Sequence, residues 1–363
     1  PALSVPLDDD YSINEEEFRV YLRWIKSFYD QGIQGLVCNG HTGEITGLTR
    51  AERKRVVEIC AEECGDIMTI ISGVNCENTQ ESIEMAAEAK EAGADGILLM
   101  PPHMWLRFGM NPNAPFEYIK DVAEGADIDI IIHLYPATSK AFYPVETLIK
   151  MCKEIDHVKC IKMGTRVTSI YEHDVRLLRQ ECPDISLITC HDETLCVSWF
   201  PGMDGALIGF AGCVPELICP AREVFANPDK HTLKEAQDWS DRIYHISQAI
   251  YGGGQPSGEA HARLKETLYQ RGIFKSALMR KPVLPLNQEE KDWIAEGIKN
   301  SGLVASAAHF HSEEGRNERL TNTALTAHHA DDVLDLAELV RFNQQAFLFI
   351  LGAAACGTCA AGA

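Results

Sequence analysis

The stretch Val158–Gly164 reads Val-Lys-Cys-Ile-Lys-Met-Gly and sets a lysine near the end of an apolar run. The run predicts a buried strand, and a helix-like segment follows it. A lysine inside such a strand is costly unless it is paired or functional. Lys162 is either an amine with a lowered pKa that forms a Schiff base with a ketone, or a lysine that reaches the surface from the strand end.

The same strand-then-helix unit recurs along the chain. Near-continuous apolar strands with helices between them are typical of a parallel sheet covered by helices. Seven units, preceded by a truncated first strand in Pro1–Asp10, predict an α/β fold of the (β/α)8 TIM-barrel class. The alternative is an open doubly wound sheet, which normally carries a Gly-x-Gly-x-x-Gly turn that this sequence lacks. The predicted strands are Gly35–Cys38, Met68–Val74, Gly96–Met100, Ile128–Leu134, Val158–Met163, Ser186–Cys190 and Gly205–Gly209.

Helical spacing and capping signals predict the intervening helices. Thr49 with Glu52 and Asn78 with Glu81 are capping pairs at two helix starts. The segment that follows the third strand, Pro101–Arg107, is expected to be a loop. The predicted helices are Glu15–Tyr29, Arg50–Cys64, Thr79–Ala92, Pro115–Glu124, Val145–Ile155, Thr168–Cys182, a short one after His191-Asp192-Glu193 and one from about Pro215.

Three parts are predicted along the chain: the barrel over residues 1–225, a C-terminal helical extension over 226–303, and a tail over 304–363. The extension contains helical patterns at Thr232–Tyr251, Gly258–Gly272 and Gln288–Asn300. The tail differs in composition and has one amphipathic stretch at Asp331–Phe342. It docks weakly, swaps between subunits or is disordered, and the sequence does not decide which.

Composition restricts the class of protein and its partners. The 363 residues carry a formal charge of −20, which argues against nucleic acid and anionic membranes as partners. The longest apolar run, Ala346–Cys356, is too short to span a bilayer. The 13 cysteines have irregular spacing, and the one C-x-x-C, Cys356–Cys359, has no partner pair. We expect reduced thiols in a soluble, cytoplasmic protein.

Two side chains on the preceding strand are candidates for chemistry beside Lys162. His133 and Tyr135 are two residues apart, so alternation places them on one face of strand Ile128–Leu134. If that face points inward, both lie near the lysine, where Schiff-base chemistry needs a group that moves protons. Alternatively, Tyr135 is a core aromatic with a satisfied hydroxyl and His133 fills the interior. Together, beside a buried lysine, they favour a functional site.

The loop Gly40–Glu44 is a candidate carboxylate site. Its glycines permit close backbone approach, and Thr42 can donate a hydroxyl hydrogen bond just before a helix N-terminus. Alternatively, it is an ordinary turn in which Glu44 bonds to backbone amides. The triplet His191-Asp192-Glu193 does not predict a metal site, because neighbours in sequence do not share a face and no second cluster joins them.

Four short motifs follow one another along the chain: Gly40-x-Thr42-Gly43-Glu44, the strand ending in Tyr135-Pro136, Ile161-Lys162, and Gly202-x-Asp204-Gly205. Their order and spacing resemble the dihydrodipicolinate synthase / N-acetylneuraminate lyase family of class I aldolases. The resemblance covers about Ala2 to Leu303. It implies a (β/α)8 barrel, a homotetramer or homodimer, and a lysine Schiff base with pyruvate or another 2-keto acid. No cofactor or metal is expected, because the iminium is the electron sink.

The resemblance also assigns the substrate contacts. Lys162 becomes the Schiff-base lysine, and Thr42 with the backbone of Gly43 holds the keto-acid carboxylate. His41, which precedes Thr42, is expected to bind substrate as well. Gly209, at the end of the last predicted strand, completes this part of the expected substrate-binding set.

The family's catalytic tyrosine has two candidates here. If Pro136 is aligned with the family's proline, that tyrosine falls on His133, and Tyr135 lies two residues later on the same face. Either is a candidate proton shuttle. Tyr135 is preferred by a small margin, because a phenol is the family's chemistry.

Other departures from the family narrow the function. His41 replaces the first threonine of the family's pair, and Pro101–Arg107 lacks the tyrosine that the family loop lends to a neighbouring subunit. Ala137-Thr138-Ser139 stand where the synthase has an arginine for a second carboxylate. We therefore expect a divergent member and not a true dihydrodipicolinate synthase.

Three functions remain open. The first is a lyase, aldolase or hydratase-aldolase acting on a 2-keto acid, in which Trp105 and Phe108 either stack on an aromatic acceptor or cover the barrel mouth or a subunit contact. The second is a 2-keto-3-deoxy sugar-acid dehydratase that uses the same lysine, with His41 and His103 as acid-base groups. The third is a non-catalytic member that binds a keto acid.

Overall fold

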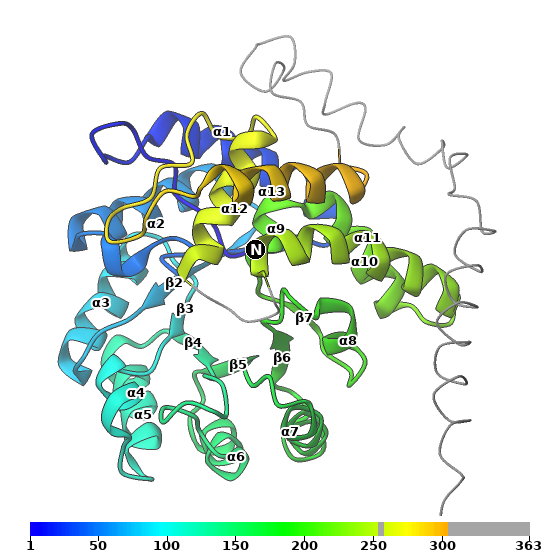
Figure 1. Cartoon of the computed structure of the whole chain (residues 1–363). Helices are drawn as coiled ribbons and strands as arrows, with labels where there is room; N and C mark the ends of the chain where they lie inside the picture. The colour runs from blue at the N-terminus through cyan, green and yellow to red at the C-terminus, as the bar shows by residue number, and fades with distance from the viewer. Residues whose placement is uncertain (253–257, 304–363) are drawn as a thin grey trace, which may run out of the picture. The chain divides into compact units, whose positions relative to one another are not determined.

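The computed structural model describes residues 1–252 and 258–303, and its centre is a curled parallel sheet (Figure 1). Seven strands lie in chain order from β1 to β7, and each pairs in parallel with the next. Helices surround the sheet on the outside in Figure 1. The predicted barrel class is confirmed. The strands are β1 Gly35–Cys38, β2 Thr69–Val74, β3 Gly96–Leu99, β4 Asp129–His133, β5 Val158–Met163, β6 Ser186–Thr189 and β7 Gly205–Ala206.

The first few residues of the chain join the two edges of this sheet. Ala2 forms a parallel bridge with Val37 of β1, and Leu3 N donates to Val37 O at 3.0 Å. On the other side, Ala2 N donates to Ile208 O at 2.9 Å, just beyond β7. Residues 2 and 3 thus lie between the first and last strands, but they form only an isolated bridge, and the truncated first strand expected within Pro1–Asp10 stays a prediction.

The helices that cover the barrel agree with the predicted pattern, with two exceptions, α4 and α9. The Thr49 and Glu52 capping box is present, and the Asn78 side chain accepts from Glu81 N. The helix α4 has six residues and occupies a segment expected to be a loop, and α9 has four residues and precedes the helix predicted from Pro215. Neither has a side-chain cap, and both are too short to show a periodic pattern, so the sequence does not predict them. The helices are α1 Glu15–Lys26, α2 Arg50–Cys64, α3 Thr79–Glu91, α4 His103–Phe108, α5 Ala114–Ala126, α6 Val145–Glu154, α7 Thr168–Glu181, α8 Leu195–Trp199, α9 Phe210–Cys213 and α10 Pro215–Ala226, with 3-10 turns η1 Tyr29–Gln31 and η2 Ile45–Gly47.

Three further helices follow as predicted: α11 Leu233–Tyr251, α12 Gly258–Gln270 and α13 Gln288–Asn300. They pack against the last part of the barrel. The Tyr251 ring meets the Phe210 ring edge-on at 5.4 Å, and Cys213 Sγ donates to Leu264 O at 3.6 Å. The division at residues 225 and 303 stays a prediction. The tail 304–363, with its amphipathic stretch and its C-x-x-C, lies outside the described residues.

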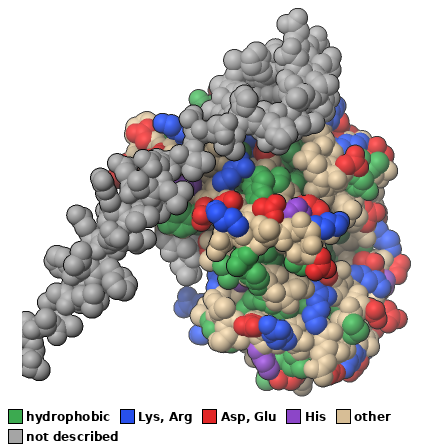
Figure 2. Space-filling model, turned by 90° about the vertical axis from the view of Figure 1, so that its right-hand side faces the viewer, with side chains coloured by type: hydrophobic (Ala, Val, Ile, Leu, Met, Phe, Trp, Pro, Cys, Tyr) green, Lys and Arg blue, Asp and Glu red, His purple; other side chains and the backbone are tan. Residues whose placement is uncertain are grey.

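Within the described part of the chain, no helix has the length and apolar character needed to cross a membrane. The described cysteines are all free thiols. On the face shown in Figure 2, Lys and Arg side chains lie among Asp and Glu side chains. Among the described residues, Arg55 forms ion pairs with Glu15, Glu58 and Glu62.

Candidate active site

Lys162 lies near the carboxyl end of β5, with His133 as its neighbour on β4. The two Cα atoms are paired in the sheet register. Burial lowers the pKa of the Lys162 amine, against the raising effect of nearby Cys190 and Asp192. The side chain still keeps some accessible surface. A lysine with a lowered pKa is neutral in a larger fraction of molecules and is therefore a better nucleophile.

The pairing of His133 with Lys162 depends on an irregularity between β4 and β5. Ile130 pairs with Val158, but the next residue, Ile131, pairs with Cys160, so the register shifts by one position. After the shift, His133 stands opposite Lys162. Just beyond the lysine, Gly164 approaches β4 so closely that a Cβ atom there would lie 1.9 Å from Leu134 O.

His133, Tyr135 and His41 form one cluster of rings. The His133 and Tyr135 ring centroids are 4.9 Å apart in an edge-on arrangement, and the His41 ring lies 5.6 Å from His133. The Tyr135 hydroxyl is 3.2 Å from His41 Nε2, whereas His133 Nδ1 is buried without a hydrogen-bond partner among the described residues. The structure thus brings the two predicted shuttle candidates together. It leaves His133 Nδ1 unpaired, on the strand next to the one that carries Lys162.

These histidines are held neutral. Burial, followed by the charge of Lys162, lowers the pKa of His41 to about 3 and puts that of His133 well below its usual range. Burial raises the pKa of the Tyr135 phenol. At neutral pH the site therefore contains uncharged imidazoles that can accept a proton and a protonated phenol that can donate one.

The loop Gly40–Glu44 brings the predicted carboxylate contacts together only in part. The amide and hydroxyl of Thr42 form no hydrogen bond with any described residue, and the Thr42 hydroxyl oxygen would lie 3.6 Å from a Cβ built on Gly209. Gly43 N, in contrast, already donates to Gly40 O at 3.1 Å. Thr42 and Gly209 therefore face each other, while the Gly43 amide is engaged within its own turn.

The aromatic residues after β3 take different positions. Trp105 packs edge-on against Tyr118 at 5.7 Å and Tyr143 at 6.3 Å, which places it among buried aromatic side chains. Phe108 is 71% exposed. Both alternatives for these rings, stacking on an acceptor and covering the barrel mouth or a subunit contact, stay predictions. His103, from the same helix, lies in a stacked arrangement with His41 at 6.4 Å.

Two residues near the lysine were not among the predicted site residues. Asp192 is buried, accepts from Phe210 N at 2.8 Å, and has its pKa raised to about 6, mainly by burial. His261 of α12 has its pKa lowered to about 4, mainly by burial, with a further effect of the Lys162 charge. Asp192 lay in the polar triplet that was considered only as a metal site. Nothing in the sequence marks His261, since it lies on a helix beyond the barrel.

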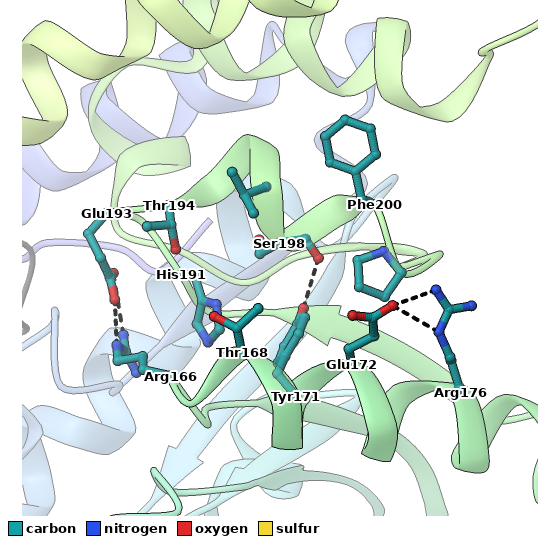
Figure 3. A pocket seen from close by; sticks show the side chains of 12 residues that line it. Arg166, Thr168, Tyr171, Glu172, Arg176, His191, Glu193, Thr194, Ser198 and Phe200 are labelled. Atoms are coloured by element: carbon teal, nitrogen blue, oxygen red, sulfur yellow. Dashed lines mark hydrogen bonds and ion pairs between the residues drawn. The ribbon is translucent and has the colours of Figure 1, made fainter. Parts of the chain in front are cut away.

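A cavity of about 390 Å³ is lined by residues of α7, of α8 and of the loops that follow β5 and β6 (Figure 3). Arg166 and Glu193 lie on one side of the cavity and form an ion pair, with Arg166 Nε 2.5 Å from Glu193 Oε1. Arg166 also donates to Gly164 O. The His191 and Tyr171 rings, both in the lining, contact each other in a tilted arrangement with centroids 4.8 Å apart. Lys162, His133 and Tyr135 do not line this cavity. Among the described residues, no cluster of His, Cys, Asp or Glu could hold a metal ion.

The buried histidines predict a loss of stability in acid. The His191 imidazole has its pKa lowered by burial to about 4, against about 6.5 in an unfolded chain. Between these pH values the unfolded state binds the proton and the folded state does not, so the free energy of unfolding falls as the pH falls. His41 and His261 act in the same direction. Asp192, with its raised pKa, opposes them between about pH 4 and 6.

We expect His191→Phe to reduce this dependence. From pH 6.5 to 5, the wild-type protein should lose up to about 2 kcal/mol more than the variant, since each pKa unit corresponds to about 1.4 kcal/mol. Urea unfolding at the two pH values measures the difference. Substitution of the exposed His245 by Phe is the control, and an equal change in both variants would contradict the prediction.

The fold and this geometry place the chain in a known class. The model of the dihydrodipicolinate synthetase family matches residues 1–301, and the chain belongs to this family. A 4-hydroxy-tetrahydrodipicolinate synthase of Bartonella bacilliformis is 26% identical over 305 residues, 84% of this chain and 97% of the relative. An uncharacterized DapA-like lyase of Thermofilum pendens is 24% identical over 300 residues, 82% of this chain and 95% of the relative.

Solved structures of the family show the same fold. A prophage protein of the dihydrodipicolinic acid synthase family from E. coli K12, in complex with pyruvate, aligns with a TM-score of 0.75 at 18% identity, covering 84% of this chain and 98% of the other. Dihydrodipicolinate synthase from Thermotoga maritima aligns with a TM-score of 0.74 at 19% identity, covering 84% and 97%. The low identities agree with a divergent member of a family of class I aldolase- or lyase-type proteins.

Proposed function

We propose that this protein is a Schiff-base lyase or aldolase that acts on pyruvate or another 2-keto acid through Lys162. One observation carries the proposal: Lys162, whose amine has a lowered pKa, is paired in the sheet register with His133, whose buried Nδ1 has no partner among the described residues. A nucleophilic amine and a neutral base side by side are the two groups that iminium chemistry requires. Membership of the family supports the same reading.

The proposed reaction uses these groups in order. The neutral amine attacks the C2 carbonyl of the keto acid, and the adduct loses water to give an iminium. The iminium accepts the electron pair when the C3–C4 bond breaks, while a base removes the proton of the C4 hydroxyl and the aldehyde departs. Protonation of the enamine at C3 and hydrolysis then release the keto acid. The iminium supplies the electron sink, so the proposal includes no cofactor or metal.

The register favours His133 over Tyr135 as the group that moves these protons. The sequence led to a small preference for Tyr135, but it is His133 that pairs with Lys162, and the Tyr135 hydroxyl lies next to His41. We assign Thr42 to the substrate carboxylate, because its amide and hydroxyl are unpaired with respect to the described residues. A homotetramer or homodimer and a cytoplasmic location stay predictions.

A 2-keto-3-deoxy sugar-acid dehydratase is the second candidate. The observation in its favour is the stacked pair His41 and His103, which continues the ring cluster away from Lys162. Dehydration needs one group to remove a proton and another to protonate the departing hydroxyl, and two neighbouring imidazoles can share these tasks. The products distinguish the dehydratase from the lyase, because dehydration keeps the carbon skeleton whole and lysis releases pyruvate.

Borohydride trapping with pyruvate tests the proposal. Reduction of the iminium leaves a stable pyruvyl adduct, and we expect intact and peptide mass analysis to find it on the peptide that contains Lys162. Protein treated with borohydride alone is the control. An adduct formed only with a longer keto acid would favour the dehydratase. A folded protein that forms no adduct with any keto acid would contradict both and leave the non-catalytic keto-acid-binding alternative.

A further inference from the structure

A buried ion pair joins the carboxylate loop to the helical extension. Lys265 of α12 is 1% exposed, and its Nζ donates to Glu44 Oε1 at 2.5 Å and to Leu278 O at 2.8 Å. The other carboxylate oxygen, Glu44 Oε2, accepts from Arg280 N at 3.0 Å. One carboxylate therefore ties together three segments that are far apart in the sequence.

Glu44 lies at the end of the turn that presents Thr42. Its backbone is left-handed, with φ at 55°, and Glu44 N donates to His41 O at 3.0 Å. A non-glycine residue in this conformation costs of order 1–2 kcal/mol and persists only where the surroundings hold it. The bonds from Lys265 and Arg280 are what hold the Glu44 side chain, and they thereby restrict the turn two residues away from Thr42.

The same helix supports the opposite side of the proposed carboxylate contact. A Cβ atom on Gly209 would lie 2.6 Å from Leu264 Cδ1 and 3.6 Å from the Thr42 hydroxyl oxygen. Leu264 and Lys265 are neighbours on α12, so one turn of this helix contacts both Gly209 and Glu44. The Arg280 side chain also contacts this loop, because its Nη1 donates to Gly47 O at 2.7 Å.

Stability alone is a weak reason for such a pair. Buried ion pairs are often no more stabilising than well-packed apolar residues of the same size, because desolvation offsets the attraction. What the pair supplies, and an apolar contact would not, is a fixed direction for the Glu44 carboxylate.

We propose that Lys265 is a positioning residue for substrate binding: through Glu44 it holds the turn that directs Thr42 at the keto-acid carboxylate. This inference rests on the proposed function. The helical extension then takes part in the binding site from outside the barrel strands.

Lys265→Met tests the proposal, because methionine has a similar length and no charge. In borohydride trapping, we expect the pyruvate concentration for half-maximal adduct to rise about tenfold, while the maximal adduct on Lys162 is retained. The matched control is Arg271→Met. Arg271 is also buried and ion-paired, with Glu216 at 2.6 Å, but it holds Cys213 O instead of the loop. An equal rise in both variants would show a general loss of stability and overturn the proposal.

A double variant and an exchange measurement complete the test. If Lys265 acts through Glu44, Lys265→Met combined with Glu44→Gln should raise the half-maximal concentration no further than the larger single effect; additive effects would overturn the proposal. Amide hydrogen exchange over residues 40–47 should be faster in Lys265→Met than in Arg271→Met; no difference would also overturn it. Hydrogen exchange is measured without a keto acid. It therefore still tests the role of Lys265 in holding the loop if the wild-type protein forms no adduct and the proposed function is wrong.

Discussion

Lys162→Met should form no borohydride-trapped adduct and should turn over substrate at least about 10⁴-fold more slowly than the wild type. The expected loss is this large because the covalent step has no alternative nucleophile in the proposed mechanism, and 10⁴-fold corresponds to only about 5.4 kcal/mol of a typical enzymatic barrier reduction. Methionine fills a similar volume and removes only the amine. The measurement is trapping with pyruvate, followed by peptide mass analysis and a steady-state assay for pyruvate release.

Lys159→Met is the matched control, since Lys159 belongs to the same strand but is exposed. We expect this variant to trap pyruvate like the wild type. Trapping on another lysine in the Lys162→Met protein, with turnover preserved, would show that Lys162 is a structural residue and that the proposed chemistry takes place elsewhere.

His133→Phe should lower kcat by about 10²–10⁴-fold while leaving trapping with pyruvate largely intact. Proton transfer by a positioned side chain contributes a factor of this size, and the amine of Lys162 remains available for the first step. His133→Tyr differs from it by one hydroxyl group and supplies the phenol that the family resemblance places here. We expect His133→Tyr to recover part of the lost rate.

Tyr135→Phe separates the two shuttle candidates. If His133 moves the proton, removing the Tyr135 hydroxyl costs less than His133→Phe, because it removes only the hydrogen bond to His41. Comparison of kcat for the two Phe variants makes the decision. A larger loss in Tyr135→Phe would assign the shuttle to the phenol, as the sequence first led us to expect.

The barrel was predictable because its signals are local. Apolar runs such as Val158–Met163 and capping pairs such as Thr49 with Glu52 are read within a few residues, and both appear in the structure at the predicted positions. Which residue of β4 pairs with Lys162 could not be predicted, because the pairing depends on the one-residue register shift after Ile130, and such a shift leaves no mark in the strand's own composition.

The contribution of α12 could not be predicted for a different reason. Lys265 and Glu44 are 221 residues apart, and a lysine in a helical pattern is normally read as a solvated side chain. Only tertiary packing shows that this lysine is buried. Asp192 stands in the triplet His191-Asp192-Glu193, whose spacing predicts no site, and only the folded structure shows that Asp192 interacts with Lys162.

Pairing between residues from the first and last parts of the described chain has a consequence for folding. Ala2 bonds to Ile208, Glu17 accepts from the backbone of Lys275, and Glu44 pairs with Lys265. Contacts of such long sequence separation slow folding, because the intervening chain must be ordered first. During synthesis, the segment around Glu17 and Glu44 must wait until about residue 280 has left the ribosome. The contact of Ala2 with Ile208, which joins the sheet edges, needs the chain only as far as residue 208, whereas the contact of Glu44 with Lys265 also needs α12. The sheet edges can therefore meet before the Gly40–Glu44 loop is held in place.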